Sequence, residues 1–434
     1  MKKISVVLIA ALVVSLLFGC GKSDDAKGTG KTTLSVWYWG EQEVPGYKAY
    51  MEEMVKRYEK KNPDIKVEAV LQESDNLYTA FRTAEAAGEG PDIQYMWGGT
   101  QAMEDVWKGN VAPISDYISE EELSVIPKSA LAQTNWNGKQ WGIPAYGFTY
   151  GIAYDKEAMR TAGVDPENPF TTWDEFLECA KALTEDSDGD GEVDQWGFSM
   201  VGSNNSSGQS RFMSYLWSNG CNLVTDNDGE WVADLGDNFT DLLKFWTDMN
   251  NEYGVVPTGI TEVDYATAAN YFAMGYTSMM LTGSNAIGVA YANNEDLKGK
   301  IGSFPIPGDA AGTMLNAEGY ALCSSASDEQ KTAAVDFLKF FTNNDSDLMF
   351  WQSSGKIPAT TEAQKAEYIT GDDYTGYLQT IENGCIAPTT FAGISGLKSL
   401  LGDAYSSVFS GEATNEEASD TFASELDNLL EDYN

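Results

Sequence analysis

The sequence predicts an α/β protein in which helices cover a largely parallel β-sheet. Strand-like and helix-like segments alternate over residues 34–96, and this alternation is typical of βαβ units. The chain has 434 residues, which is more than one ordinary hydrophobic core organises, so two lobes or one large domain are expected. Hydrophobic residues make up 42% of the chain, a globular rather than a disordered composition.

The elements of this first region follow from their apolar patterns. Apolar or alternating runs, typical of strands, cover residues 34–39, 65–71 and 92–96. Apolar residues at helical spacing cover residues 47–58 and 77–87. The first helical pattern stops before Asn62-Pro63 and the second ends at Gly88, and both are typical stop signals.

The stretch 151–184 contains a clear helix start. Thr172 is a favoured N-cap, and Glu175 stands three residues later, where its side chain can reach back to the Thr172 N–H. Apolar residues then recur at helical spacing, at Trp173, Phe176, Leu177, Ala180 and Leu183. We therefore expect Trp173 and Phe176 to pack in a core rather than to contact a ligand.

The N-terminus has the pattern of a secretion signal. A basic start precedes an apolar run over residues 4–18, which is too short to favour a membrane-spanning helix. The run ends in LFGC, at Cys20, which resembles a bacterial lipobox with an unusually bulky Phe. We expect residues 1–19 to be a lipoprotein signal peptide, Cys20 to carry the lipid, and residues 20–33 to be a polar tether. The alternative is a plain secretory peptide with an incidental cysteine.

Charge and composition exclude several function classes. The formal net charge is −39, so nucleic acid and anionic membrane surfaces are poor partners. The chain has no histidine, which excludes Ser-His-Asp and Cys-His catalysis and HExxH zinc sites. The remaining cysteines show no CxxC motif, which indicates neither a zinc site nor a dense disulfide framework. Their pairing is left open for Cys179, Cys221, Cys323 and Cys385.

An acidic loop predicts a structural calcium site. Oxygen ligands at alternating positions, with a glycine at the sixth, fit the start of an EF-hand loop. The expected ligands are Asp186, Asp188, Asp190, Glu192 (through its carbonyl) and Asp194. Gly197 stands where the closing bidentate Glu would be, so another ligand is needed and the affinity should be modest. The alternative is a surface turn rich in Asp and Gly.

Aromatic and polar residues at predicted strand ends and lobe crossings are candidate ligand contacts. Sugars present C–H patches to aromatic rings and hydroxyls to amides and carboxylates, and open sheets bind ligands at the carboxyl ends of strands. The candidates are Trp39, Glu41, Trp97, Thr100, Tyr146, Tyr215, Trp217 and Trp351. For each aromatic residue, core packing is the alternative.

Several segments stand in a family-specific order. They are NPDIKVE (62–68), GEGPDIQYM (88–96), GKQWGIPAYG (138–147), PFTTWDEF (169–176), YFAMGYTSMMLTG (271–283), FPIPG (304–308) and VDFLKFFTNND (335–345). In this order they resemble the family 1 extracellular solute-binding proteins, the maltose-binding-protein-like receptors of carbohydrate ABC transporters. In that family a Trp commonly stands at the position of Asn285, and Gly-Gly stands near Glu318. The resemblance therefore adds Asn285 and Glu318 to the ligand candidates, with a turn as the alternative for Glu318.

The resemblance also implies an architecture and partners. The implied fold is a two-lobe periplasmic-binding-protein-like fold of type II, with two parallel-rich sheets, flanking helices and hinge strands. It places the N-terminal lobe at 34–147 plus 310–351 and the C-terminal lobe at 148–309 plus 352–434. The implied protein is a monomer at the extracellular face of the bacterial cell membrane, and its partners are ABC permease subunits.

The function predicted first is a receptor that captures an oligosaccharide and delivers it to an ABC importer by cleft closure, without enzymatic activity. One alternative is a receptor of the same fold for another solute, such as a polyamine or peptide. A second is a surface glycoside hydrolase, since two carboxylates suffice for that chemistry. A third is a structural lipoprotein.

Overall fold

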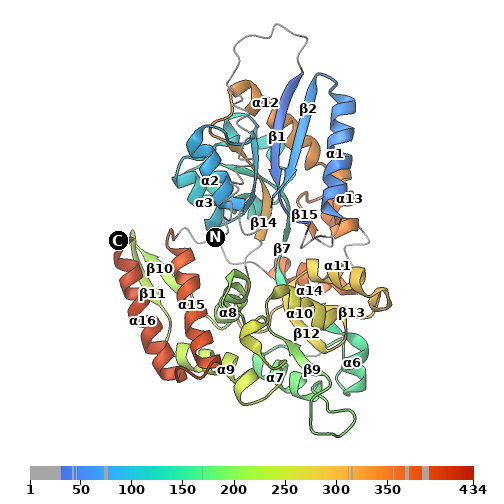
Figure 1. Cartoon of the computed structure of the whole chain (residues 1–434), viewed down its shortest axis with the longest axis vertical. Helices are drawn as coiled ribbons and strands as arrows, with labels where there is room; N and C mark the ends of the chain where they lie inside the picture. Colours follow the sequence, from blue (N-terminus) through green and yellow to red (C-terminus); the bar gives the residue numbers. More distant parts are fainter. Residues whose placement is uncertain are drawn as a thin grey trace, which may run out of the picture.

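The structure, a computed structural model, describes residues 31–41, 44, 46–72, 77–168, 170–310, 312–313, 316–354, 356–366, 371–383 and 391–434. It consists of two lobes, each built around its own sheet, and these occupy the upper and lower halves of Figure 1. None of the described helices combines the length and the apolar composition that a bilayer crossing requires.

The sheet of the N-terminal lobe has seven strands in the order β15-β7-β14-β3-β1-β2, with β4 paired to β14. The strands are β1 (Thr32–Tyr38), β2 (Ile65–Leu71), β3 (Ile93–Trp97), β4 (Val111–Ala112), β7 (Gly142–Phe148), β14 (Asn316–Cys323) and β15 (Ile357–Pro358). The strands β2 and β3 both pair with β1 in parallel, as the alternation over residues 34–96 predicted.

Helices flank this sheet on both sides (Figure 1). They are α1 (Tyr47–Lys61), α2 (Leu77–Ala87), α3 (Thr100–Trp107), α12 (Asp328–Phe341) and α13 (Asn344–Ser354). Smaller elements are α4 (Glu120–Leu123), α5 (Lys128–Ala132), 3₁₀ turns at Ile114–Asp116 and Ala363–Lys365, and the hairpin β5 (Asn135–Trp136) and β6 (Lys139–Gln140). Buried residues of α1 recur at helical spacing, at Tyr47, Tyr50, Met51, Met54 and Tyr58.

The sheet of the C-terminal lobe has four strands in the order β13-β8-β12-β9. They are β8 (Tyr150–Asp155), β9 (Trp196–Ser199), β12 (Thr277–Gly283) and β13 (Ile301–Phe304). A separate hairpin is formed by β10 (Leu223–Asn227) and β11 (Glu230–Asp234).

The helices of this lobe are α6 (Lys156–Thr161), α7 (Trp173–Ala182), α8 (Ser206–Ser218), α9 (Phe239–Asn251), α10 (Tyr265–Ala273), α11 (Asn285–Asn293), α14 (Asp372–Asn383), α15 (Ile394–Phe409) and α16 (Asn415–Glu431), with 3₁₀ turns at Ile260–Glu262 and Glu295–Leu297. The capping box predicted at Thr172 and Glu175 is confirmed. Trp173 and Phe176 are buried in the core of the lobe, as expected, and the Trp173 indole N–H donates to Ser218 Oγ at 2.8 Å.

Both sheets are mixed, which corrects the prediction of parallel-rich sheets. In the N-terminal lobe β14 runs antiparallel to β3, β4 and β7, and β15 runs antiparallel to β7. In the C-terminal lobe β12 is parallel to β9, but β8 is antiparallel to β12 and β13. The βαβ pattern covers only the strands joined by helices within one lobe. A helical crossover makes two strands parallel, but a strand that enters its sheet from the other lobe, such as β8 or β14, can run in either direction.

The chain crosses between the lobes three times. The first crossing lies at Thr149, between β7 and β8, and the second lies between Phe304 and Asn316. The third was expected at 351/352, but β15 pairs with β7 and therefore still belongs to the N-terminal sheet. The segment stays with the N-terminal lobe beyond Pro358, since the Thr361 N–H donates to the Val125 carbonyl at 3.0 Å and the turn Ala363–Lys365 packs against α13 and β15. The expected boundary was wrong because a two-residue strand is too short to produce a recognisable pattern.

Candidate functional site

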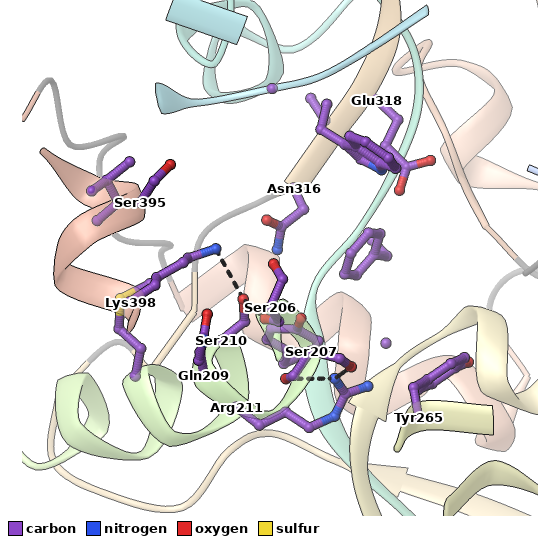
Figure 2. A pocket seen from close by; sticks show the side chains of 18 of the residues that line it. Ser206, Ser207, Gln209, Ser210, Arg211, Tyr265, Asn316, Glu318, Ser395 and Lys398 are labelled. Atoms are coloured by element: carbon purple, nitrogen blue, oxygen red, sulfur yellow. Dashed lines mark hydrogen bonds between the residues drawn. The ribbon is translucent and has the colours of Figure 1, made fainter. Parts of the chain in front are cut away.

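A cavity of about 550 Å³ lies between the two sheets. Its walls come from the carboxyl ends of β1 and β3, from the first crossing, and from α2, α8, α10, α11, β14 and α15. Figure 2 shows polar side chains of α8 and α15 opposite Asn316 and Glu318 of β14. Each lobe therefore supplies one wall of the cavity.

The wall from the N-terminal lobe is aromatic. Trp39 follows β1, and Trp97 ends β3. Their ring centroids are 4.8 Å apart, at an interplanar angle of 65°. The ring of Tyr78, from the first turn of α2, packs against the ring of Trp97. The Tyr78 hydroxyl accepts a hydrogen bond from the backbone N–H of Trp97 at 3.0 Å. The parallel strands β1 and β3 end at the same edge, which brings these rings together as a platform.

A buried ion pair joins β14 to the residue that precedes β15. Lys356 Nζ lies 2.8 Å from Glu318 Oε1, and the two side chains are 0% and 1% exposed. The Tyr95 hydroxyl donates to the other carboxylate oxygen at 2.7 Å, and Lys356 Nζ lies 4.6 Å from the centroid of the Phe148 ring. The carboxylate of Glu318 is thereby fixed at the edge of the cavity.

A glycine lets the crossing strand approach the second sheet. Gly283 ends β12 and lines the cavity beside Phe148. A Cβ at Gly283 would lie 2.7 Å from the Phe148 ring, closer than side-chain atoms approach one another. The absence of a side chain at Gly283 thus allows the Phe148 ring to pack directly against the end of β12.

The wall from the C-terminal lobe is polar. Asn205 caps α8 and accepts hydrogen bonds from the backbone N–H groups of Ser207 and Gly208. The first turns of α8 then present Ser206, Ser207, Gln209 and Ser210 to the cavity. Across from them, the Asn285 side-chain amide donates to the Tyr265 hydroxyl at 3.0 Å. Hydroxyl and amide groups of this kind can bind the hydroxyls of a ligand.

Four of the ten predicted ligand residues line the cavity. They are Trp39, Trp97, Asn285 and Glu318. Trp39 and Trp97 lie at the carboxyl ends of β1 and β3, whereas Asn285 begins α11 and Glu318 lies near the start of β14. Contact with a ligand itself stays a prediction.

Four other predicted residues lie elsewhere. Glu41 accepts hydrogen bonds from the N–H groups of Gly46 and Lys48, so it fixes the start of α1. Tyr146 is buried in the core of the N-terminal lobe. Tyr215 and Trp217 are buried in the core of the C-terminal lobe.

The last two predicted residues, Thr100 and Trp351, belong to α3 and α13. Their side chains lie outside the described part of the structure.

Some lining residues were not predicted from the sequence. The most informative are Tyr78, Arg211, Tyr265 and Lys398. Arg211 has a recognisable signal, because it opens the apolar run RFMSYLW, and a charged residue on an apolar helix rarely lacks a specific role. Lys398 and Tyr265 carry no comparable signal.

Three carboxylates of the acidic loop converge. Ligand oxygens of Asp186, Asp188 and Asp194 all lie within 4.8 Å of one another, and the three side chains are exposed. Asp186 accepts hydrogen bonds from the N–H groups of Gly189 and Gly191, which hold the turn. The arrangement fits a divalent cation bound by oxygen ligands.

One of the expected carboxylate ligands, Asp190, is not part of that group, and the expected contact of the Glu192 carbonyl stays a prediction. The Asp190 carboxylate instead accepts a hydrogen bond from the Glu192 N–H at 2.8 Å.

The cysteines within the described residues are unpaired. The thiols of Cys179, Cys221 and Cys323 are free and buried. Burial raises the pKa of Cys179 and of Cys221 to about 12, so neither thiol is a reactive nucleophile. Cys20 and Cys385 lie outside the described residues.

The family follows from a match over most of the chain. The model of the bacterial extracellular solute-binding protein family matches residues 41–347. The chain belongs to this family. Among relatives of this solute-binding protein, the arabinooligosaccharide-binding protein of Bacillus subtilis (strain 168) is 24% identical, over 87% of this chain and 86% of the relative.

Solved structures show the same fold. One is an ABC transporter solute-binding protein from Thermotoga lettingae TMO bound with α-D-tagatose. It has a TM-score of 0.81 and 23% identity, over 92% of this chain and 100% of that chain. Maltose-bound MalE3 of T. maritima has a TM-score of 0.79 and 22% identity, over 92% of this chain and 100% of that chain. The two-lobe fold predicted for this solute-binding protein is thereby confirmed.

Proposed function

We propose that this protein is an extracytoplasmic receptor that binds an oligosaccharide and delivers it to the permease subunits of an ABC importer. The observation that carries the proposal is the cavity, with the Trp39–Trp97 platform on one lobe and hydroxyl and amide groups on the other. A sugar ring offers C–H faces to the first wall and hydroxyls to the second. The names of the similar proteins, which mention arabinooligosaccharide, tagatose and maltose, support a sugar as the ligand.

The mechanism requires no covalent step. A ligand that contacts both walls stabilises the arrangement in which the lobes are close together, because only there are both sets of contacts made. The hinge segments allow the lobes to move, and the permease subunits recognise the closed form.

An enzymatic role is not proposed. Hydrolysis of a glycosidic bond needs two carboxylates about 5 to 10 Å apart. Among the described residues that line the cavity, Glu318 is the one carboxylate, and it is already paired with Lys356. The cavity residues therefore support binding rather than acid–base catalysis.

Two accessory features belong to the proposal. Cys20 carries a lipid that anchors a monomeric protein to the outer face of the cell membrane. The residues between Cys20 and β1 form the tether, which is two residues shorter than expected because β1 begins at Thr32. Asp186, Asp188 and Asp194 hold a calcium ion that fixes the loop after α7. The calcium proposal is supported by the convergence of these carboxylates, which repel one another without a cation.

The proposal is tested by a thermal-shift screen of mono- and oligosaccharides, because a ligand that binds only the folded state raises the unfolding midpoint. We expect one class of oligosaccharide to raise the midpoint and to make the protein more compact in small-angle X-ray scattering. The absence of any response to sugars, combined with a response to a polyamine or peptide, would replace the proposal with the alternative solute. Release of new reducing ends from a bound oligosaccharide would refute the receptor function.

A further inference from the structure

The charged side chains of the cavity differ in sign from those of the chain as a whole. The chain has 66 acidic and 27 basic residues. The described residues that line the cavity nevertheless include two cations, Arg211 and Lys398, and one carboxylate, Glu318. Because Glu318 is already paired with Lys356, the charges left for a ligand are positive.

Arg211 is held rigidly and has one nitrogen left over. Its side chain is buried, with 4% of the residue exposed. The Nε atom donates to the Leu281 carbonyl at 2.8 Å, and Nη1 donates to the Ser207 carbonyl at 3.0 Å. The guanidinium carbon lies 5.2 Å and 5.1 Å from the ring centroids of Tyr150 and Tyr265.

Within the described residues, Nη2 of Arg211 makes no hydrogen bond and no carboxylate lies within ion-pair distance of this guanidinium. A guanidinium fixed in this way is preorganised for an anionic oxygen. The cavity thus contains a buried cation that no described acidic group neutralises.

Lys398 places a second cation against the same helix. It extends from α15, and its Nζ donates to Ser210 Oγ at 3.0 Å. Ser207 and Ser210 lie one turn apart on α8, so this helix links the two cations (Figure 2). No described carboxylate lies within ion-pair distance of Lys398. Burial lowers the pKa of the Lys398 ammonium to about 8.

An acidic residue near this end of the cavity is already neutralised. Glu104 accepts a hydrogen bond from Ser395, which lines the cavity. Its carboxylate also pairs with Arg82 at 3.0 Å and Lys108 at 3.6 Å. Glu104 therefore does not supply the missing counter-charge.

We propose that the carbohydrate bound in this cavity carries an anionic group, a carboxylate or a sulfate, and that Arg211 and Lys398 bind it. The inference rests on the proposed carbohydrate receptor function and specifies its ligand. The sugar ring contacts Trp39 and Trp97 of the N-terminal lobe, and the anionic group contacts the two cations of the C-terminal lobe. The ligand charge thereby compensates one buried and one half-buried cation that have no described carboxylate beside them, and the same ligand connects both lobes.

The experiment is isothermal titration calorimetry of the full mature chain with matched ligands. The ligands are uronic-acid trisaccharides, the neutral trisaccharides obtained by reducing their carboxyl groups, and the sulfated forms of those neutral trisaccharides. We expect the charged member of at least one set to bind about tenfold or more tightly than its neutral counterpart, the range of a charge-assisted hydrogen bond. The uronate and sulfate members distinguish the two sources of negative charge.

Variants assign the effect to the cavity. Lys398→Met removes the ammonium and keeps the chain length, and it breaks one described hydrogen bond. Because Arg211 remains, we expect it to weaken the preference for the charged ligand several-fold rather than abolish it, and Lys398→Arg to restore part of the loss. The control is Lys128→Met, which makes the same change in net charge at an exposed position outside the cavity. It should leave both affinities unchanged.

Three results would overturn the inference. A neutral member that binds as tightly as its charged counterparts removes the reason for an anionic ligand, while the proposed receptor function stands. A preference for the charged ligand that is as strong in Lys398→Met as in the wild type removes Lys398 as an assigned residue. Failure of the charged trisaccharides to bind, while a neutral sugar raises the midpoint in the thermal-shift screen, overturns the inference and leaves the proposed function standing; failure of every sugar in both experiments removes both.

Discussion

Replacing Lys356 by methionine is expected to destabilise the protein strongly. The variant leaves the Glu318 carboxylate, which is 1% exposed, without its cation, although the hydrogen bond from the Tyr95 hydroxyl remains. Loss of one partner from a buried ion pair costs about 3 to 5 kcal/mol, since the remaining charge cannot reach water. Glu318→Gln is expected to cost a similar amount, because it leaves the Lys356 ammonium buried without its anion.

The double variant separates the cost of an orphaned charge from the value of the pair. Glu318→Gln with Lys356→Met contains no buried charge at this position, so it should be more stable than either single variant. Lys56→Met serves as the control, because Lys56 pairs with Glu53 while 80% of its side chain is exposed. That change should cost less than about 1 kcal/mol.

The assay is urea unfolding at neutral pH, followed by both tryptophan fluorescence and circular dichroism, with thermal midpoints as a second measurement. A loss of less than about 1 kcal/mol in both single variants, as in the Lys56 control, would refute the reasoning. A double variant that is less stable than both single variants would also refute it, since the pair would then contribute more than it costs to bury.

Further predictions concern pH, ligand contact and calcium. Burial raises the pKa of Asp347 from 3.8 to about 7, so its favourable contribution is complete below about pH 4 and is lost as the pH rises through about 7. Relative to the wild type, Asp347→Asn should therefore gain on the order of 4 kcal/mol between pH 4 and pH 8 in urea unfolding, and a difference that does not vary with pH would contradict this. Trp97→Ala should weaken oligosaccharide binding about tenfold, because the ring forms the platform, and it should also lower stability, because the ring packs against Trp39 and Tyr78. Trp217→Ala should lower stability by about 3 to 5 kcal/mol and leave the affinity of the folded protein unchanged; the opposite pattern would restore Trp217 as a ligand contact. Millimolar CaCl₂ should raise the thermal midpoint, EGTA should reverse the rise, and Asp194→Asn should remove it; an unchanged midpoint in the wild type would refute the calcium site.

The first strands and helices could be predicted because their two faces differ. Residues 65–71 alternate in burial, and the capping box at Thr172 specifies a helix start without reference to the rest of the fold. The third crossing could not be predicted, since β15 has two residues and its membership in the first sheet depends on pairing with the distant β7.

Site residues at the ends of strands could be predicted from the sequence. The direction in which side chains of fully buried helices and strands point could not. Trp39 and Trp97 follow apolar strands, so their location at one sheet edge could be inferred. Every residue of α8 from Arg211 to Ser218 is buried, so the sequence contains no polar face that would show which way Tyr215 and Trp217 point. The strand β7 is buried on both faces up to Gly147, and the same ambiguity applies to Tyr146.

The first crossing has a mechanical consequence. A single residue, Thr149, joins β7 to β8, and it is fully buried, with its hydroxyl donating to the Tyr377 carbonyl at 3.2 Å. Its neighbours Phe148 and Tyr150 both line the cavity. No flexible loop separates the two strands at this position. A ligand that displaces the ring of Phe148 or Tyr150 therefore changes the angle between β7 and β8, which belong to the sheets of different lobes.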